Sequence, residues 1–327
     1  MGSPSLDSVQ SSPKENLTVG VPTFTMSTSK TAKVCSLTDC YLDLLKKSLT
    51  DSLHRRKCYW PVSRPKGWAK RALFDLLGER GMTLVRELDP SIREEGGDRP
   101  PTGEAWLEVT AADTLLGLQR LNNLQWCVED VLSRGVPGDL IETGVWRGGA
   151  CILMRAVLKA RGECGRKVCA ADSFEGLPVA DPQRYPLDLG SRFNQQRGFA
   201  VSLDEVRANF EKYGLLDGQV EFVKGWFSET LPKLADRTWA VIRLDGDMYQ
   251  STLEALMNLY PGLSPGGFVI IDDFGAVPAC RQAVLDFRQA NHLTEEMRVI
   301  DWSGVYWQRR SEAPSSLAHV DENHIRS

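Results

Sequence analysis

Several features that direct other kinds of function are missing from this sequence. The eight cysteines form no CxxC pair, which argues against a zinc site or a disulfide scaffold. No apolar run approaches the roughly 20 residues that span a bilayer, and the N-terminus lacks the apolar core of a signal peptide. The formal net charge of −4 gives no electrostatic reason to expect nucleic-acid or membrane binding. We therefore expect a reduced, soluble, cytoplasmic protein that binds neither.

Histidine is also scarce. Of the four histidines, only His54 and His292 fall in the region expected to fold, and neither belongs to a motif. Because histidine is the most frequent general base in enzymes, its scarcity here favours carboxylates as the groups for an acid–base reaction. The cysteines in apolar segments are expected to be buried; these are Cys127, Cys151, Cys169 and Cys280.

Composition and periodicity divide the 327 residues into four parts. The polar tails, 1–33 and 311–327, lack periodicity and are predicted to be disordered. We expect a helical N-terminal region at 34–135 and an α/β domain at 136–310. In the helical region, helices are predicted at 37–53, at 69–77 and around a buried face in 115–131, with a charged loop at 88–104. The first helix is expected to bury Leu42, Leu44, Leu45, Leu49 and Leu53, and the third Leu115, Leu118, Leu121, Val128 and Val131.

From Gly138 onward, strand-like runs alternate with helical segments. Strands are predicted at 139–142, 167–171, 220–224, 240–244 and 268–271, followed by an antiparallel pair within 297–307. Helices are predicted to start near Gly148, Leu203, Thr252 and Ala279. This alternation predicts a mostly parallel sheet with helices on both faces, in which ligands bind at the carboxyl ends of the strands.

Four aspartates follow two of these strands. Asp245 and Asp247 come after the run that ends at Leu244, and Asp272 and Asp273 come after the run that ends at Ile271. Neighbouring parallel strands would bring the four carboxylates to one edge, where their repulsion favours a bound cation. Each aspartate alone could instead cap a helix or form a turn.

A glycine turn follows the first predicted strand. It has the spacing E-x-G-x-x-x-G from Glu142 through Gly144 to Gly148, whereas a dinucleotide-binding loop would read G-x-G-x-x-G. The spacing resembles the first motif of S-adenosylmethionine-dependent methyltransferases. The same glycines would also suit an ordinary strand–turn–helix connection.

Two further strand ends carry candidate cofactor contacts. Asp172 could accept hydrogen bonds from ribose hydroxyls, or it could form an Asx turn. Gly225 and Trp226 offer a glycine turn and an aromatic ring that could cover an adenine, although tryptophan also serves in cores.

Read together, these motifs resemble the macrocin O-methyltransferase family, which methylates sugar hydroxyls of macrolide and aminocoumarin antibiotics. The resemblance extends from about residue 38 to 310 and is carried by YLDLLKKSLT (41–50), VPGDLIETGVWRGG (136–149), ADSFEGLP (171–178), AVSLDEVR (200–207), KGWF (224–227), RLDGDMYQST (243–252) and LSPGGFVIIDDF (263–274). It implies a Rossmann-like class I methyltransferase with a seven-stranded sheet and N-terminal helical additions. It also implies S-adenosylmethionine, Mg²⁺, a homo-oligomer and a glycoside acceptor that offers a vicinal pair of hydroxyls.

The resemblance also implies roles for individual residues. The metal ligands would be Asp245, Asp272 and Asp273. Asp247 would be the general base, with Asp245 as a second candidate. The implied cofactor-binding residues are Glu142, Thr143, Gly144, Arg147, Gly148, Asp172, Ser173, Phe174, Gly225, Trp226, Phe227 and Asp245.

The sequence departs from the family in its first 33 residues and at Asp113, where many relatives carry histidine in a segment that lines the acceptor pocket. The acceptor is therefore left open. The segments 178–198 and 88–104 could each form a lid over the site or an idle surface loop.

Three other functions remain possible from the sequence. A catechol-type methyltransferase would use the same metal and an aromatic diol. An NAD-dependent oxidoreductase is disfavoured by the glycine spacing and by the lack of a Tyr-x-x-x-Lys pair. A methyltransferase-like binding module without activity is disfavoured by the complete set of carboxylates.

Overall fold

The computed structural model describes residues 36–53, 58–61, 65, 67–80, 82, 85–88 and 112–310. The predicted tails, His54 and residues 89–104 of the predicted loop lie outside the described residues. Among the described helices, none is both long and apolar enough to cross a bilayer.

The centre of the fold is a seven-stranded sheet with the order β5-β4-β3-β6-β7-β9-β8. Its strands are β3 (Asp139–Thr143), β4 (Val168–Asp172), β5 (Val220–Lys224), β6 (Trp239–Leu244), β7 (Leu263–Ile271), β8 (Arg298–Val299) and β9 (Val305–Gln308). Strands β3 to β7 are parallel, whereas β9 pairs antiparallel with β7 and with β8. The predicted fold class is confirmed. The strand order reverses between β3 and β6, where open α/β sheets bind ligands.

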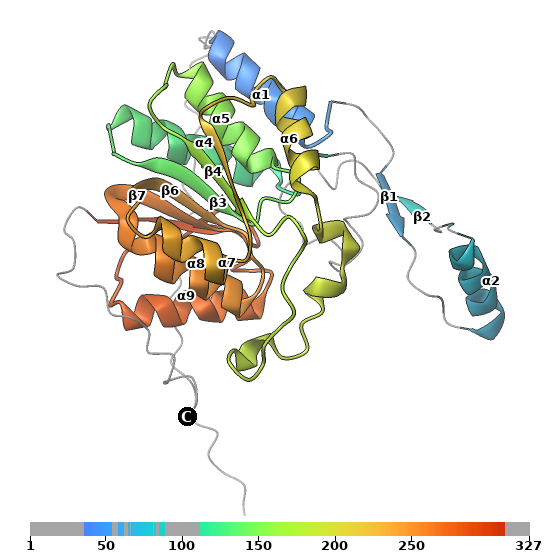
Figure 1. The fold of residues 1–327 in the computed structure, drawn as a ribbon. Coiled ribbons are helices and arrows are strands. Elements are labelled where there is room, and N and C mark those ends of the chain that lie inside the picture. Colours follow the sequence, from blue (N-terminus) through green and yellow to red (C-terminus); the bar gives the residue numbers. More distant parts are fainter. Residues whose placement is uncertain are drawn as a thin grey trace, which may run out of the picture. The chain divides into compact units, whose positions relative to one another are not determined.

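Helices cover both faces of this sheet (Figure 1). One layer holds α1 (Leu37–Leu49), α4 (Leu118–Ser133), α5 (Gly149–Ala160) and α6 (Leu203–Lys212), and the other holds α7 (Phe227–Thr230), α8 (Tyr249–Leu259) and α9 (Pro278–Ala290). Each layer packs on its own apolar cluster, since Leu121 and Leu153 belong to one and Leu256 and Phe287 to the other. Short 3₁₀ turns are η1 (Pro186–Asp188), η2 (Phe193–Gln195), η3 (Arg197–Phe199), η4 (Leu231–Leu234) and η5 (Tyr260–Gly262).

The helix α1 is shorter than predicted. Its N-terminus is capped by Ser36, whose hydroxyl accepts the Asp39 N–H at 3.1 Å, and it ends at Leu49 instead of continuing to 53. Leu42, Leu45 and Leu49 are buried as predicted, but Leu44 and Leu53 are 57% and 44% exposed. Apolar residues spaced three to four positions apart lie on one face of a helix. They reach the core only where the chain is helical and only on that face.

The third predicted helix begins later than its apolar pattern suggested. Helix α4 starts at Leu118, so Leu115 precedes it and is 37% exposed, contrary to the prediction that it is buried. Helix α2 (Trp68–Glu79) matches the second predicted helix. Strands β1 (Cys58–Pro61) and β2 (Val85–Leu88), which were not predicted, pair antiparallel. Leu88 therefore ends a strand and does not begin a loop.

The thiols expected to be buried are buried: Cys127, Cys151, Cys169 and Cys280. Each lies within a helix or strand that contributes to the apolar core. Burial raises the pKa of these thiols, which favours the uncharged form.

Candidate active site

The register of three adjacent strands brings their carboxyl ends level. Thr143 of β3 pairs with Leu244 of β6, and Leu244 pairs with Ile271 of β7. The ladder continues one step further, because the Asp245 N–H donates to the Thr143 carbonyl at 2.9 Å and the Asp272 N–H donates to the Leu244 carbonyl at 2.9 Å. Both aspartate clusters therefore meet at the point where the strand order reverses.

The predicted carboxylate cluster forms at this edge. One carboxylate oxygen from each of Asp245, Asp272 and Asp273 lies within 4.8 Å of the others. Asp247 adjoins this cluster, since its backbone N–H donates to Asp273 Oδ2 at 3.2 Å. Asp247 has a φ of 57°, a left-handed backbone conformation that non-glycine residues adopt rarely and mostly where the surrounding structure enforces it.

Two arginines that sequence reasoning missed lie among these carboxylates. Arg243 is 1% exposed and makes ion pairs with Glu142, with Asp245 at 2.9 Å and with Asp272 at 2.5 Å. A charged residue inside the otherwise apolar run of β6 was the signal that could have revealed it, because fully buried arginines need partners. Arg120 of α4 forms a second ion pair with Asp272, and the sequence around it gave no comparable signal.

Burial and mutual repulsion hold protons on several of these carboxylates. Burial, reinforced by Asp245 and Asp272, raises the pKa of Asp247 to about 8. Burial and the neighbouring Asp272 raise the pKa of Asp245 to about 6, and burial raises that of Asp273 well above its usual value. The two arginines therefore do not fully offset the effect of burial and of repulsion among the carboxylates on these pKa values.

A cavity of about 390 Å³ opens beside the cluster. It is lined by nine of the residues predicted for cofactor binding or catalysis: Glu142, Gly144, Asp172, Ser173, Gly225, Trp226, Phe227, Asp245 and Asp247. The loop before α4 adds Thr114, Leu115 and Leu116, and the start of α8 adds Gln250, Ser251 and Glu254. No histidine is among the described residues that line it, and His292 is exposed at the end of α9.

Four predicted cofactor residues do not line this cavity: Thr143, Arg147, Gly148 and Phe174. Phe174 is 4% exposed and packs edge-on against Phe222. Arg147 donates to the Ala112 carbonyl at 2.9 Å, and its guanidinium carbon lies 4.6 Å from the Trp146 ring centroid. The contacts in the structure therefore give these two side chains packing roles.

Asp172 closes the turn after β4. Its Oδ2 accepts the Val145 N–H at 2.7 Å and its Oδ1 accepts the Phe174 N–H at 2.7 Å. Burial nevertheless raises its pKa, although these backbone hydrogen bonds oppose the shift. The Asx turn that the sequence left open is thus present, and the Ser173 hydroxyl also donates to Oδ1 at 3.4 Å.

Gly144 is the first glycine of the motif, and packing requires a glycine at this position whether or not a ligand binds there. Gly144 has a φ of 79°, and a Cβ built on it would lie 1.8 Å from the Asp245 carbonyl oxygen. Only glycine lets the turn after β3 pass so close to the turn after β6. The loop that could face a cofactor is thereby fixed against the loop that carries the catalytic candidates.

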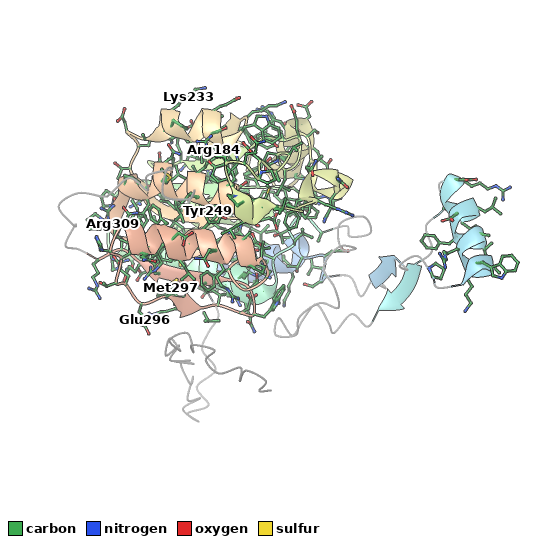
Figure 2. All side chains as sticks on the ribbon, turned by 90° about the horizontal axis from the view of Figure 1, so that it is seen from below. Arg184, Lys233, Tyr249, Glu296, Met297 and Arg309 are labelled. Atoms are coloured by element: carbon green, nitrogen blue, oxygen red, sulfur yellow. The ribbon has the colours of Figure 1, made fainter. Side chains whose placement is uncertain are left out.

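The segment 178–198 borders the cavity and is packed in its middle. Pro178 and Val179 line the cavity, whereas Tyr185 and Asp188 are 3% and 2% exposed. The Tyr185 ring lies 6.2 Å from that of Tyr249 on α8. Figure 2 shows this helical layer from below, with Tyr249 labelled next to α9, and the Tyr249 hydroxyl donates to Asp286 of α9 at 2.8 Å.

Asp113 does not line the cavity, although it belongs to the segment that was expected to line the acceptor pocket. It is 5% exposed, and its Oδ2 accepts from Lys212 Nζ and from the Tyr213 hydroxyl, each at 2.6 Å. It therefore anchors the loop before α4 to the end of α6. The residue that follows it, Thr114, does line the cavity.

Comparison with known proteins agrees with this geometry. The sequence model of the family described as Macrocin-O-methyltransferase (TylF) matches residues 38–309. Over 280 residues the chain is 47% identical to the 8-demethyl-8-(2,3-dimethoxy-alpha-L-rhamnosyl)-tetracenomycin-C 4'-O-methyltransferase of Streptomyces olivaceus, covering 85% of this chain and 96% of that protein. It is 42% identical over 274 residues to the mycinamicin III 3''-O-methyltransferase of Micromonospora griseorubida, covering 83% and 96%.

A solved structure matches over a similar span. The O-methyltransferase NovP superposes with a TM-score of 0.69 and 40% sequence identity, covering 84% of this chain and 99% of that chain. The two chains therefore share the whole methyltransferase fold.

Proposed function

Because the chain belongs to the macrocin O-methyltransferase family, we propose that this O-methyltransferase moves the methyl group of S-adenosylmethionine to a hydroxyl on the sugar of a glycosylated natural product. The observation that supports this most is that Asp245, a member of the carboxylate cluster, lines one cavity together with Asp247 and the Gly144 and Asp172 turns. A methyl donor and a hydroxyl acceptor could then lie side by side, and such alignment supplies several kcal/mol of rate enhancement, about 7–11 in favourable cases.

The carboxylate cluster fits a divalent cation. Asp245, Asp272 and Asp273 would hold it, because their oxygens converge and Mg²⁺ prefers oxygen ligands. Burial, and after it repulsion from neighbouring carboxylates, raises the pKa of Asp245 and of Asp247, and a cation would relieve the repulsion. When bound, Mg²⁺ would lower the pKa of a coordinated hydroxyl and orient the acceptor.

Asp247 is the general base in this proposal. It lines the cavity beside the cluster, and its carboxylate would take the proton of the acceptor hydroxyl while the oxygen attacks the methyl carbon. The C–S bond breaks as the O–C bond forms, which leaves a neutral thioether and a methyl ether. Asp245 also lines the cavity and remains the second candidate for this role.

The chain offers groups suited to the methyl donor. Asp172 would receive the ribose hydroxyls, and Trp226 and Phe227 offer aromatic surface for the adenine.

The acceptor need not present two free hydroxyls. The name of the tetracenomycin relative places its reaction at position 4' of a rhamnosyl group that carries methoxy groups at positions 2 and 3. A hydroxyl beside an ether oxygen would still give a cation two neighbouring oxygen ligands. We therefore propose that the acceptor does not need a vicinal diol. It needs a hydroxyl whose adjacent carbon carries an oxygen of any kind.

The proposal is tested with the full chain, S-adenosylmethionine carrying a labelled methyl group, and a set of matched acceptors. These are an aromatic polyketide rhamnoside, its 3-methoxy and 3-deoxy derivatives, the sugar-free aglycone and a catechol. We expect label on the rhamnoside and the 3-methoxy derivative, little on the 3-deoxy derivative, loss of activity with a chelator and recovery with Mg²⁺. Labelling of the catechol or aglycone in place of the glycosides would contradict a sugar acceptor.

A further inference from the structure

We propose that Arg120, on α4, is a positioning residue for the metal site and fixes the orientation of the Asp272 carboxylate. The inference rests on the proposed function, because it presupposes that a divalent ion binds at Asp245, Asp272 and Asp273. The proposal places part of the metal site on α4. This helix belongs to the helical N-terminal region expected at 34–135, not to the α/β domain expected at 136–310.

The contacts of Arg120 are buried and specific. Its Nη1 forms an ion pair with Asp272 Oδ2, and its Nε donates to Asp301 Oδ2 at 2.8 Å. The side chains of Arg120, Asp272 and Asp301 are 13%, 7% and 3% exposed. Solvent screens such a pair far less than it screens surface ion pairs, so the geometry is held tightly.

The turn between β8 and β9 keeps Arg120 in place. Asp301 is fixed by the N–H groups of Ser303 and Gly304, which donate to its Oδ1 at 2.9 and 2.7 Å. The guanidinium carbon lies 5.7 Å from the Trp302 ring centroid. Arg120 is therefore oriented from several sides before it reaches Asp272.

The same turn also holds the backbone of Asp272. The Ser303 hydroxyl donates to the Asp272 carbonyl at 2.6 Å. The turn between β8 and β9 thus holds Asp272 in two ways. Ser303 binds its backbone carbonyl directly, and Asp301 holds Arg120, which binds its carboxylate. A shift of that turn would move both together.

Two arginines divide the Asp272 carboxylate between them. Arg243 contacts Oδ1 at 2.5 Å, and Arg120 contacts Oδ2. With each oxygen held by its own guanidinium, the plane of the carboxylate is fixed, while a second lone pair on each oxygen remains for an ion. Hydrogen-bonded partners of this kind orient metal ligands, and their loss typically weakens metal affinity by roughly 10–100-fold.

The two possible roles of Arg120, orienting Asp272 or only supplying positive charge, predict opposite changes in metal affinity when Arg120 is removed. If Arg120 acts only as a positive charge, its loss removes repulsion from the dication and tightens binding. If it orients Asp272, its loss lets the carboxylate rotate away and weakens binding. We infer the second because Arg120 is itself fixed by Asp301, which a simple counter-charge would not need.

The test measures Mn²⁺ binding to the full chain by electron paramagnetic resonance, a readout independent of turnover. The variants are Arg120→Met, Arg120→Lys and Asp301→Asn, with Arg134→Met as the control at the other end of α4, where the side chain is 39% exposed and paired with Asp130. We expect Arg120→Met to weaken binding by roughly 10–100-fold, Arg120→Lys and Asp301→Asn by less, and Arg134→Met not at all.

The outcomes separate the two proposals. If the wild-type chain binds no Mn²⁺, the proposed metal-dependent function fails and this inference fails with it. If the wild type binds and folded Arg120→Met binds equally well or more tightly, only the positioning role is overturned. Should Arg120→Met fail to fold, Arg120→Lys and Asp301→Asn decide: weaker binding in both supports the role, and unchanged binding overturns it.

Discussion

The carboxylate of Asp188 caps helix α8 by accepting the backbone N–H of Tyr249 at 2.8 Å, across 61 residues of sequence. Its other oxygen accepts the Gln250 N–H at 3.0 Å, and Met248 at the N-cap position provides no side-chain hydrogen bond. Helix α8 begins two residues after Asp247. The segment 178–198 therefore helps to define where the candidate base is placed.

Replacement of Asp188 by alanine should remove this cap. We expect the free energy of unfolding to fall by about 1–2 kcal/mol, because two N–H groups at the start of α8 lose their acceptor. Urea denaturation measures the change. Asp181→Ala is the control, since Asp181 accepts N–H groups within an exposed turn of the same segment and should cost under about 0.5 kcal/mol. Equal losses in both variants would contradict the capping role.

Gly144→Ala should lower the stability of the fold more than Gly162→Ala does. Both glycines have positive φ, 79° and 70°, but only at Gly144 would a Cβ meet the Asp245 carbonyl oxygen, whereas nothing lies within 4 Å at Gly162. We expect about 3 kcal/mol or more of destabilisation for Gly144→Ala and about 1 kcal/mol for Gly162→Ala. Thermal or urea unfolding of the two proteins tests this, and similar losses would mean that backbone strain alone sets the cost.

Asp247→Asn should abolish the base while leaving the methyl donor site intact. We expect kcat to fall by roughly 10²–10⁴-fold, with little change in the affinity for S-adenosylhomocysteine measured by calorimetry. Asp236→Asn, at an exposed position, is the control and should be as active as the wild type. Retention of wild-type kcat in Asp247→Asn would transfer the role to Asp245.

The stability of the protein without added divalent cation should fall as the pH rises. In the folded state the pKa values of Asp245 and Asp247 are raised to about 6 and about 8, above the ordinary value of 3.8. The folded protein therefore keeps protons that the unfolded chain releases, and this stabilisation is lost as the pH rises through the folded values, between about pH 4 and 8.

Melting temperatures measured across this pH range, with and without Mg²⁺, test the expectation. Added Mg²⁺ should flatten the slope, because a bound cation stabilises the charged carboxylates. A slope that does not respond to Mg²⁺ would indicate that the ion does not bind these carboxylates.

Much of the site could be predicted before the structure was known. Apolar runs followed by Asp245 and Asp272 alternate with helical segments. This alternation predicts parallel strands whose carboxyl ends meet at one edge. The turns at Gly144 and Asp172 follow from the same reasoning, and both line the cavity. These signals are local, since each depends on residues adjacent in the chain.

The sequence was thus enough to predict the alternation of strands and helices from β3 onward, the family and the carboxylates at the strand ends, but not strands β1 and β2. Only the tertiary structure decided that β3 lies beside β6, that Arg120 and Arg243 divide the Asp272 carboxylate, and that Asp188 caps α8. It also moved Asp113 from a pocket position to an anchor on α6. The reason is physical: periodicity and turn chemistry act between near neighbours, whereas buried ion pairs and long-range caps depend on distances that exist only after the sheet has assembled.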